Sequence, residues 1–319
     1  MRTITTNLSN IINQVLGDKL QIVDKVTTTN EIESSKVSHI AKVLQAWEDL
    51  QLKLYNLYKE YKGSANMNDV FSKFGNELKF LNDNIQLEDI QVKFQDNYIR
   101  AFYGKKRIAQ FSLKNGKLLP NEQGQGFLIW SVLGHITCNG KTGLCSGYCY
   151  NNSKSFDTHI QFKIDNLITS TLDIFEPLVL KMLQCNPYGQ AFVRIHEDGD
   201  YYNMDYFTKW LNISKKKKEL IFESYTKEPK LLKMVNSINE SNSNFVLRFS
   251  LMEDTKKDII EYVAKNNVPN YTVIGEKKKD KATKEIFDQI NKKNKCVNSC
   301  KYCKKCYSSN NITIINMLH

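Results

Sequence analysis

The hydrophobic positions of residues 1–88 recur mostly at steps of three and four, the spacing of residues on one face of an α-helix. One series runs from Val37 to Tyr61, and a second runs from Met67 to Leu81 after a polar stretch with a glycine. The two series predict a helical hairpin within an N-terminal helical region. The aromatic side chains in them are expected to be core residues.

The hydrophobic period changes to two in residues 89–118. Ile90, Val92 and Phe94 alternate with polar residues, and Gly104 marks a turn further along. Alternation of this kind is typical of strands with one buried face. The segment is therefore predicted to be a small antiparallel β-meander.

Short apolar runs alternate with helical series over residues 119–319. The runs are FLIWSVL, AFVRIH, LIFESYT, FVLRFSL and YTVIG. Strands that alternate with helices indicate parallel strands joined by right-handed crossovers. We expect an α/β domain that is either a partial (β/α) barrel or an open parallel sheet. In both architectures ligands bind at the carboxyl ends of the strands, so the residues after each run are the candidates for function.

The composition is that of a folded globular protein, because 41% of the 319 residues are hydrophobic and 25% are charged. No apolar run approaches the roughly 20 residues that span a bilayer. The N-terminus also lacks the basic and then apolar pattern of a secretory signal. We therefore expect a cytoplasmic protein with no membrane association.

The cysteines are the strongest chemical signal in the sequence. Cytoplasmic thiols stay reduced, so clustered cysteines there predict metal binding or catalysis and not disulfides. Cys185 stands alone and is expected to be an ordinary buried thiol. The other seven fall into two groups, at Cys138, Cys145 and Cys149 and at Cys296, Cys300, Cys303 and Cys306.

The first group has the spacing C-x6-C-x3-C directly after the first apolar run of the α/β domain. Three thiolates on one loop can each bind an iron of a [4Fe–4S] cluster and leave the fourth iron for another ligand. Gly140, Gly143 and Gly147 would let the backbone approach the cluster closely. Zinc binding is the alternative.

The second group has the spacing C-x3-C-x2-C-x2-C. Bacterial ferredoxins use C-x2-C-x2-C-x3-C, which has the same intervals in reversed order. Structural zinc sites more often use two separated pairs of cysteines, so a second iron–sulfur cluster is favoured and zinc stays the alternative. The neighbouring lysines would lower the pKa of these thiols, or would contact nucleic acid.

Ionisable residues follow the second apolar run in the sequence HEDGD. Glu197 and Asp200 are candidates for proton transfer, and together with their neighbours for binding a divalent metal. The alternative is a hydrogen-bonded turn in which Asp200 caps a helix that starts near Met204.

Three residues within or after the strands are candidates for ligand binding. Arg194 lies inside an apolar strand, where a buried guanidinium needs an anion, and Glu223 is the natural structural partner. Tyr225 and Lys227 come at the end of the third run and are expected to face a ligand, although tyrosine also favours strands generally.

The formal net charge is +11, and much of the excess lies in lysine runs such as Lys215–Lys218. Such runs are usually solvated helix ends and loops. A polyanionic partner, nucleic acid above all, is the functional interpretation.

Several motifs, in this order, resemble the phage gene product 88 domain family, over about residues 107–308. Members occur on phages, prophages and plasmids and have no well-defined function. The motifs are NGKLL, FLIWSVLGHITCNGKTGLCSGYCY, VRIHEDGDYYNMDYFTKW, FESYTKEP, FVLRFSL and the terminal cysteines.

This family in turn is more distantly similar to radical S-adenosylmethionine enzymes. That likeness implies a partial barrel in which Cys138, Cys145 and Cys149 ligate a cluster that binds S-adenosylmethionine. It also implies that Glu197, Gly199 and Asp200 line the cosubstrate.

Three hypotheses stay open from the sequence. The chain is an iron–sulfur enzyme of the radical S-adenosylmethionine type, a non-catalytic iron–sulfur or zinc protein that binds nucleic acid or a host protein, or a metalloprotein whose cysteines only stabilise the fold. The substrate of an enzyme is not indicated.

Overall fold

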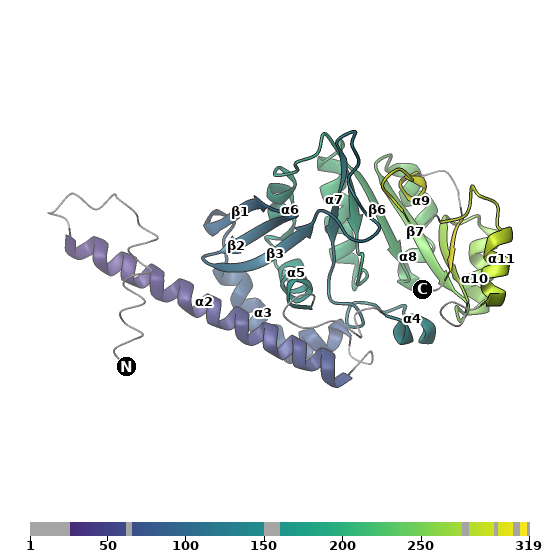
Figure 1. Ribbon diagram of the computed structural model, residues 1–319. Coiled ribbons are helices and arrows are strands. Elements are labelled where there is room, and N and C mark those ends of the chain that lie inside the picture. The colour runs from purple at the N-terminus through teal and green to yellow at the C-terminus, as the bar shows by residue number, and fades with distance from the viewer. Residues whose placement is uncertain are drawn as a thin grey trace. The chain divides into compact units, whose positions relative to one another are not determined.

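The computed structural model of the protein describes residues 26–61, 66–149, 160–275, 281–296, 299–308 and 313–317 (Figure 1). The chain divides into two compact units, Met1–Val43 and Leu44–His319. In the first unit, the described residues 26–43 are the beginning of helix α2 (Val26–Tyr61). Residues 1–25 of the predicted N-terminal helical region lie outside the described part of the chain. The sheet and both cysteine groups belong to the second unit.

Both helical series of the N-terminal region form helices. The first lies within α2, and the second forms α3 (Met67–Asn84). Asn66 begins α3 with a capping box, since its side chain accepts from the Asn68 amide at 2.8 Å and its own amide donates to Asp69 at 2.8 Å. An ion pair of 2.7 Å between Lys53 and Glu77 joins α2 to α3. Within the described residues, no helix is long and apolar enough to cross a membrane.

One nine-stranded sheet follows, with the strands side by side in chain order. Strands β1 to β4 pair in an antiparallel manner, so the predicted meander is confirmed and is continuous with the rest of the sheet. Strands β4 to β9 are parallel. The strands are β1 (Ile90–Gln95), β2 (Tyr98–Tyr103), β3 (Lys106–Ser112), β4 (Gln125–Trp130), β5 (Gln190–Ile195), β6 (Ile221–Thr226), β7 (Phe245–Met252), β8 (Asn270–Ile274) and β9 (Ile314–Met317).

The parallel part is an open sheet and not a closed barrel. The strand order leaves β1 and β9 as the edges of the described sheet, and the meander occupies the side on which a barrel would have to close. All five apolar runs of the α/β domain are strands, as expected, and β9 is a further strand that the sequence pattern did not predict. The helices of the second half are α4 (Gly143–Gly147), α5 (Gln161–Thr171), α6 (Phe175–Leu183), α7 (Met204–Lys216), α8 (Pro229–Leu232), α9 (Val235–Ser241), α10 (Lys257–Lys265) and α11 (Lys281–Gln289).

The two faces of the parallel sheet are covered differently. Right-handed crossovers between strands in sequential order put their helices on the same face. On that face Trp130 packs against Phe175 of α6 and Trp210 of α7, with ring centroids 5.7 and 5.8 Å apart. We call the opposite face the open face. There Phe192 packs against Tyr307, at 4.8 Å between centroids, so the C-terminal cysteine segment covers it.

Asp165 of α5 connects three elements through one buried carboxylate. It accepts hydrogen bonds from Trp47 and Gln51 of α2 and from Arg107 of β3, the first and last at 3.0 and 2.9 Å. Burial raises the pKa of Asp165, and Arg107 opposes that rise. The carboxylate holds the C-terminal part of α2 to the sheet.

We expect Asp165→Ala to lower the free energy of unfolding by about 3 to 5 kcal/mol, because it leaves a cation and two donors without their buried acceptor. Urea denaturation measures the change. Asp83→Ala is the control, since Asp83 pairs with Lys79 on an exposed helix surface and such pairs contribute at most about 0.5 kcal/mol. Equal effects of the two substitutions would contradict this role for Asp165.

Candidate functional site

The first cysteine group lies across the carboxyl ends of the parallel strands, as predicted. Its segment leaves β4 and passes over the ends of β6 and β7. The backbone at Gly140 lies directly against the carbonyl of Lys227, which follows β6. The amide of Leu144 donates to Asp254, which follows β7, at 2.7 Å. The segment is therefore anchored to two strands that come much later in the chain.

Local sequence explains how this segment folds. Thr142 caps the short helix α4, because its hydroxyl accepts from the amide of Cys145 at 3.2 Å. A Cβ atom at position 140 would lie 1.6 Å from the carbonyl oxygen of Lys227. Only glycine fits that contact between two stretches of backbone.

Cys138 has an unusual electrostatic environment. Burial raises the pKa of Cys138 well above its ordinary value, and Asp200, Asp198 and Cys145 raise it further. A hydrogen bond from the backbone of His135 to Cys138 acts in the opposite direction. Nearby acidic groups and a second thiol thus disfavour a free thiolate here.

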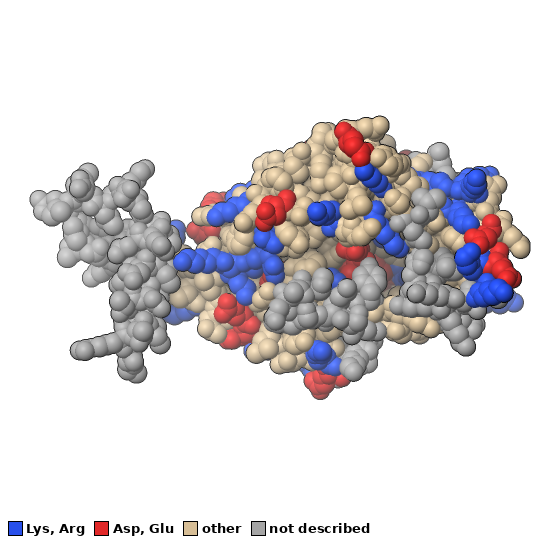
Figure 2. Space-filling model, in the orientation of Figure 1, with Lys and Arg blue, Asp and Glu red and all other residues tan. Residues whose placement is uncertain are grey.

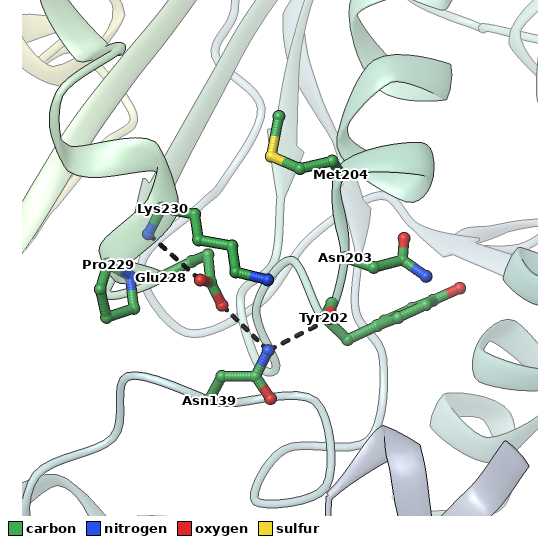
Figure 3. A pocket seen from close by; sticks show the side chains of 7 residues that line it. All are labelled: Asn139, Tyr202, Asn203, Met204, Glu228, Pro229 and Lys230. Atoms are coloured by element: carbon green, nitrogen blue, oxygen red, sulfur yellow. Dashed lines mark hydrogen bonds between the residues drawn. The ribbon is translucent and has the colours of Figure 1, made fainter.

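A cavity of about 340 Å³ adjoins the same segment (Figure 3). Asn139, the neighbour of Cys138, donates to the carbonyl of Tyr202 at 3.1 Å and to the carboxylate of Glu228 at 2.9 Å. Sequence reasoning missed Asn139 and Glu228. The acidic residue before Pro229 at the start of a helix was a signal for the second of them. The lining residues are Asn139, Tyr202, Asn203, Met204, Glu228, Pro229 and Lys230.

Asp200 joins the ends of β5 and β6. It accepts from the amide of Tyr201, the hydroxyl of Thr226 and the amide of Lys227, each at 2.7 Å. Burial raises its pKa to about 6, and these hydrogen bonds oppose the rise. The expectation that Asp200 caps α7 was wrong, because Asn203 caps that helix by accepting from Tyr206 at 2.8 Å.

The other residues of the HEDGD turn are held by different partners. Glu197 accepts from Asn115 at 2.7 Å, and burial raises its pKa. Asp198 forms a buried ion pair of 2.6 Å with Lys163 of α5. Gly199 has a φ of +86°, and a Cβ there would meet Val132 at 2.5 Å. A hydrogen bond, an ion pair and close backbone packing thus hold this turn at the carboxyl edge of the sheet.

The remaining candidates divide between the two cysteine groups. Arg194 forms the predicted ion pair with Glu223 on the open face, and its guanidinium lies 3.8 Å from the ring centroid of Tyr225. Lys227 lies beside the first group, and its ammonium donates to Ser250 at 2.9 Å. Arg194 and Tyr225 therefore belong with the second cysteine group.

The second cysteine group lies on the open face, toward the amino ends of the strands, and not at the carboxyl edge where both groups were expected. The amide of Cys300 donates to the carbonyl of Lys117 at 2.9 Å, and Lys301 pairs with Glu122, just before β4. Cys300 and Cys306 pack against the apolar residues of β4 and β5. The open face needs an apolar cover, and this segment provides it.

Two thiols of this group have raised pKa values. Burial raises the pKa of Cys300 to about 11, and Cys296 and Cys303 contribute to the rise. Burial also raises the pKa of Cys306 to about 12. Beneath them, Oε1 of Glu223 and the hydroxyl of Tyr307 are buried without a hydrogen-bond partner among the described residues.

Within the described ranges, no three His, Cys, Asp or Glu side chains are arranged to hold a metal ion. A single zinc ion would draw its sulfur ligands to within about 4 Å of one another, given a Zn–S distance of roughly 2.3 Å. The ligands of a four-iron cluster stand further apart, because iron and sulfide atoms fill the space between them.

Comparison with known families identifies the chain. The model of the gene product 88 family matches residues 100–313. The chain belongs to this family. No curated protein and no solved structure matches it. The phage-family resemblance found in the sequence is thereby confirmed, whereas these comparisons give the likeness to radical S-adenosylmethionine enzymes no support.

We expect Gly140→Ala to displace the first cysteine segment of this gene product 88 protein, because the carbonyl of Lys227 leaves no room for a methyl group. Overpacking of this kind costs about 3 kcal/mol. Unfolding in urea and the alkylation rate of Cys138 measure the two consequences. Gly147→Ala is the control, since no atom lies within 4 Å of a Cβ there. Slow alkylation of Cys138 in the Gly140 variant, equal to that of the unchanged protein, would contradict the prediction.

Proposed function

We propose that this gene product 88 protein is an iron–sulfur protein with two [4Fe–4S] clusters. Three thiols at the carboxyl edge of the sheet hold the first cluster, and four thiols on the open face hold the second. The observation that carries the proposal is that two stretches far apart in the chain each fix a group of cysteines against the same parallel sheet. The ligands are Cys138, Cys145 and Cys149 for the first cluster and Cys296, Cys300, Cys303 and Cys306 for the second.

The donor set of the second group fits a cluster in its chemistry. All four donors are sulfur, the preferred ligand of iron–sulfur clusters. Cys296 and Cys303 act on the pKa of Cys300, so these thiols already lie near one another. The buried oxygens of Glu223 and Tyr307 that have no described partner lie beneath the same segment. The hydroxyl of Tyr307 could donate to a cluster sulfur, and ordered water would satisfy the carboxylate oxygen of Glu223.

The donor set of the first group fits a cluster with an open coordination position. Three thiols can hold three irons, and an exogenous ligand then completes the fourth. S-adenosylmethionine is the ligand that the more distant resemblance suggests, and it would make the protein a radical enzyme. The cavity beside Asn139 supports a small-molecule site next to Cys138. The carboxylates of Glu197 and Asp200, through their hydrogen bonds, would orient the turn beside that site.

The residues of the chain have definable tasks in such a site. Asp200 holds the ends of β5 and β6 at a fixed separation through three hydrogen bonds. Asn139 fixes the cysteine segment to the β5–α7 connection and to Glu228. The packed backbone at Gly140 keeps the segment close to the end of β6. A rigid frame of this kind positions thiols for cluster binding before the cluster arrives.

We expect the anaerobically purified and reconstituted protein to contain about eight iron and eight sulfide per chain. The triple variant Cys138→Ser, Cys145→Ser, Cys149→Ser and the quadruple variant Cys296→Ser, Cys300→Ser, Cys303→Ser, Cys306→Ser should each lose about half. Cys185→Ser is the matched control, because this partly exposed cysteine lies outside both groups. Iron and sulfide assays and electron paramagnetic resonance measure the outcome.

Colourless protein with stoichiometric zinc and no sulfide would contradict the proposal.

Added S-adenosylmethionine should change the electron paramagnetic resonance spectrum of the reduced protein and of the quadruple variant. It should not change the spectrum of the triple variant. An unchanged spectrum in protein that carries both clusters would remove the enzyme hypothesis and leave the iron–sulfur assignment intact.

A nucleic-acid-binding protein is the second candidate, because the formal net charge is +11. Figure 2 shows Lys and Arg side chains over the part of the second unit that contains α11, with acidic side chains among them. Asp288 there pairs with both Lys284 and Lys295, which reduces the local positive charge. Tight binding to duplex DNA that weakens steeply with salt would favour this candidate. Weak binding to duplex DNA at about 0.15 M salt would exclude the nucleic-acid-binding function.

A further inference from the structure

We propose that Tyr225 and Tyr271 donate hydrogen bonds to cysteine sulfurs of the second group and thereby raise the reduction potential of the cluster bound there. This inference rests on the second cluster of the proposed function. It assigns the open face a task beyond holding the cluster in place.

The two tyrosines lie side by side beneath the cysteine segment. Tyr225 is on β6 and Tyr271 is on β8, with ring centroids 4.5 Å apart. The hydroxyl of Tyr271 donates to the sulfur of Cys296 at 4.0 Å. Tyr225 lies beside Cys306, and its phenol lowers the pKa of that thiol against the effect of burial. One of the four sulfurs thus accepts from a phenol hydroxyl, and a second phenol lies beside another sulfur.

The hydroxyl of Tyr271 is oriented by a neighbouring strand. Asn316 of β9 donates its side-chain amide hydrogen to the oxygen of Tyr271 at 2.7 Å. One lone pair of the phenol is then occupied, which leaves the hydroxyl hydrogen directed toward Cys296. Asn316 is 4% exposed, so water does not compete freely for this bond. Strand β9 therefore contributes to the orientation of a donor on β8.

A neighbouring cation makes the hydroxyl of Tyr225 a stronger hydrogen-bond donor. The guanidinium of Arg194 lies over the ring of Tyr225 at 3.8 Å from its centroid and is held there by Glu223. A positive charge on the ring face withdraws electron density from the phenol and makes its O–H a better donor. The ion pair also fixes the guanidinium against this ring. Arg194 acts here through Tyr225, as a positioning residue.

Hydrogen bonds to sulfur stabilise the reduced state of a cluster more than the oxidised state. Reduction adds one electron, taken from an external donor, to the iron and sulfur atoms, and no covalent bond forms or breaks. The added negative charge is spread partly onto the cysteine sulfurs, so a donor at a sulfur interacts more strongly after reduction. Removing the hydroxyl should therefore make the cluster harder to reduce.

The alternative is that both tyrosines only fill space beneath the segment. Tyr→Phe substitutions separate the two roles, because phenylalanine keeps the ring and loses the hydroxyl. Tyr302→Phe is the matched control. Tyr302 lies within the same cysteine segment, but it is 65% exposed and its hydroxyl donates to Glu122 at 2.5 Å, away from the sulfurs.

The test uses the full-length chain with Cys138→Ser, Cys145→Ser and Cys149→Ser, which should retain the second cluster alone. Its midpoint potential is measured by anaerobic titration with dithionite, followed by electron paramagnetic resonance. We expect Tyr271→Phe and Tyr225→Phe each to lower the equilibrium constant for one-electron reduction roughly tenfold, about 59 mV. Tyr302→Phe should leave the potential unchanged.

Asn316→Ala provides a second variant that keeps both tyrosines. It should shift the potential in the same direction by a smaller amount, because the hydroxyl of Tyr271 loses its orientation. Full cluster content with unchanged potentials in both Phe variants and in Asn316→Ala would overturn the inference and leave the iron–sulfur assignment standing. Absence of any cluster in the parent chain would instead overturn the proposed second cluster itself, and the inference with it.

Discussion

The side-by-side order of six parallel strands is the constraint on which the rest of this structure depends. Right-handed crossovers between successive strands place their helices on one face only. The other face carries apolar rings such as Phe127 and Phe192 that have to be covered. In this chain the cover is the segment that bears the last four cysteines. The same topology that builds the sheet therefore brings the C-terminal thiols onto it.

Two different environments for sulfur result from this arrangement. The first cysteine group lies at the carboxyl edge beside carboxylates, where Asp200 and Asp198 act on Cys138. The second group lies over the open face beside phenols, guanidinium groups and the carboxylate of Glu223, and Arg248 donates to the carbonyls of the same segment. A cluster at the edge would be accessible to a small ligand. A cluster on the face would be enclosed by side chains that tune it.

Much of the fold was predictable because it depends on local periodicity. The alternation around Ile90 predicted the meander, and the five apolar runs are all strands. Strand β9 was not predicted, since a short run such as ITIINM near the end of the chain has no turn or helix pattern that singles it out. The choice between a barrel and an open sheet also escaped prediction, because it depends on where the meander attaches. Asp200 shows the same limit in the site, as its partners Thr226 and Lys227 are far from it in sequence.

The sequence by itself determined which residues are chemically capable of binding a metal, and it placed the first cysteine group at a strand end. Residue type and spacing are local properties, and they are readable without a fold. Only the tertiary structure decided that the second group lies on the open face, that Arg194 and Tyr225 accompany it, and that Gly140 touches the backbone after β6. Those contacts join segments about 60 to 180 residues apart, and packing of the sheet, not any local pattern, brings them together.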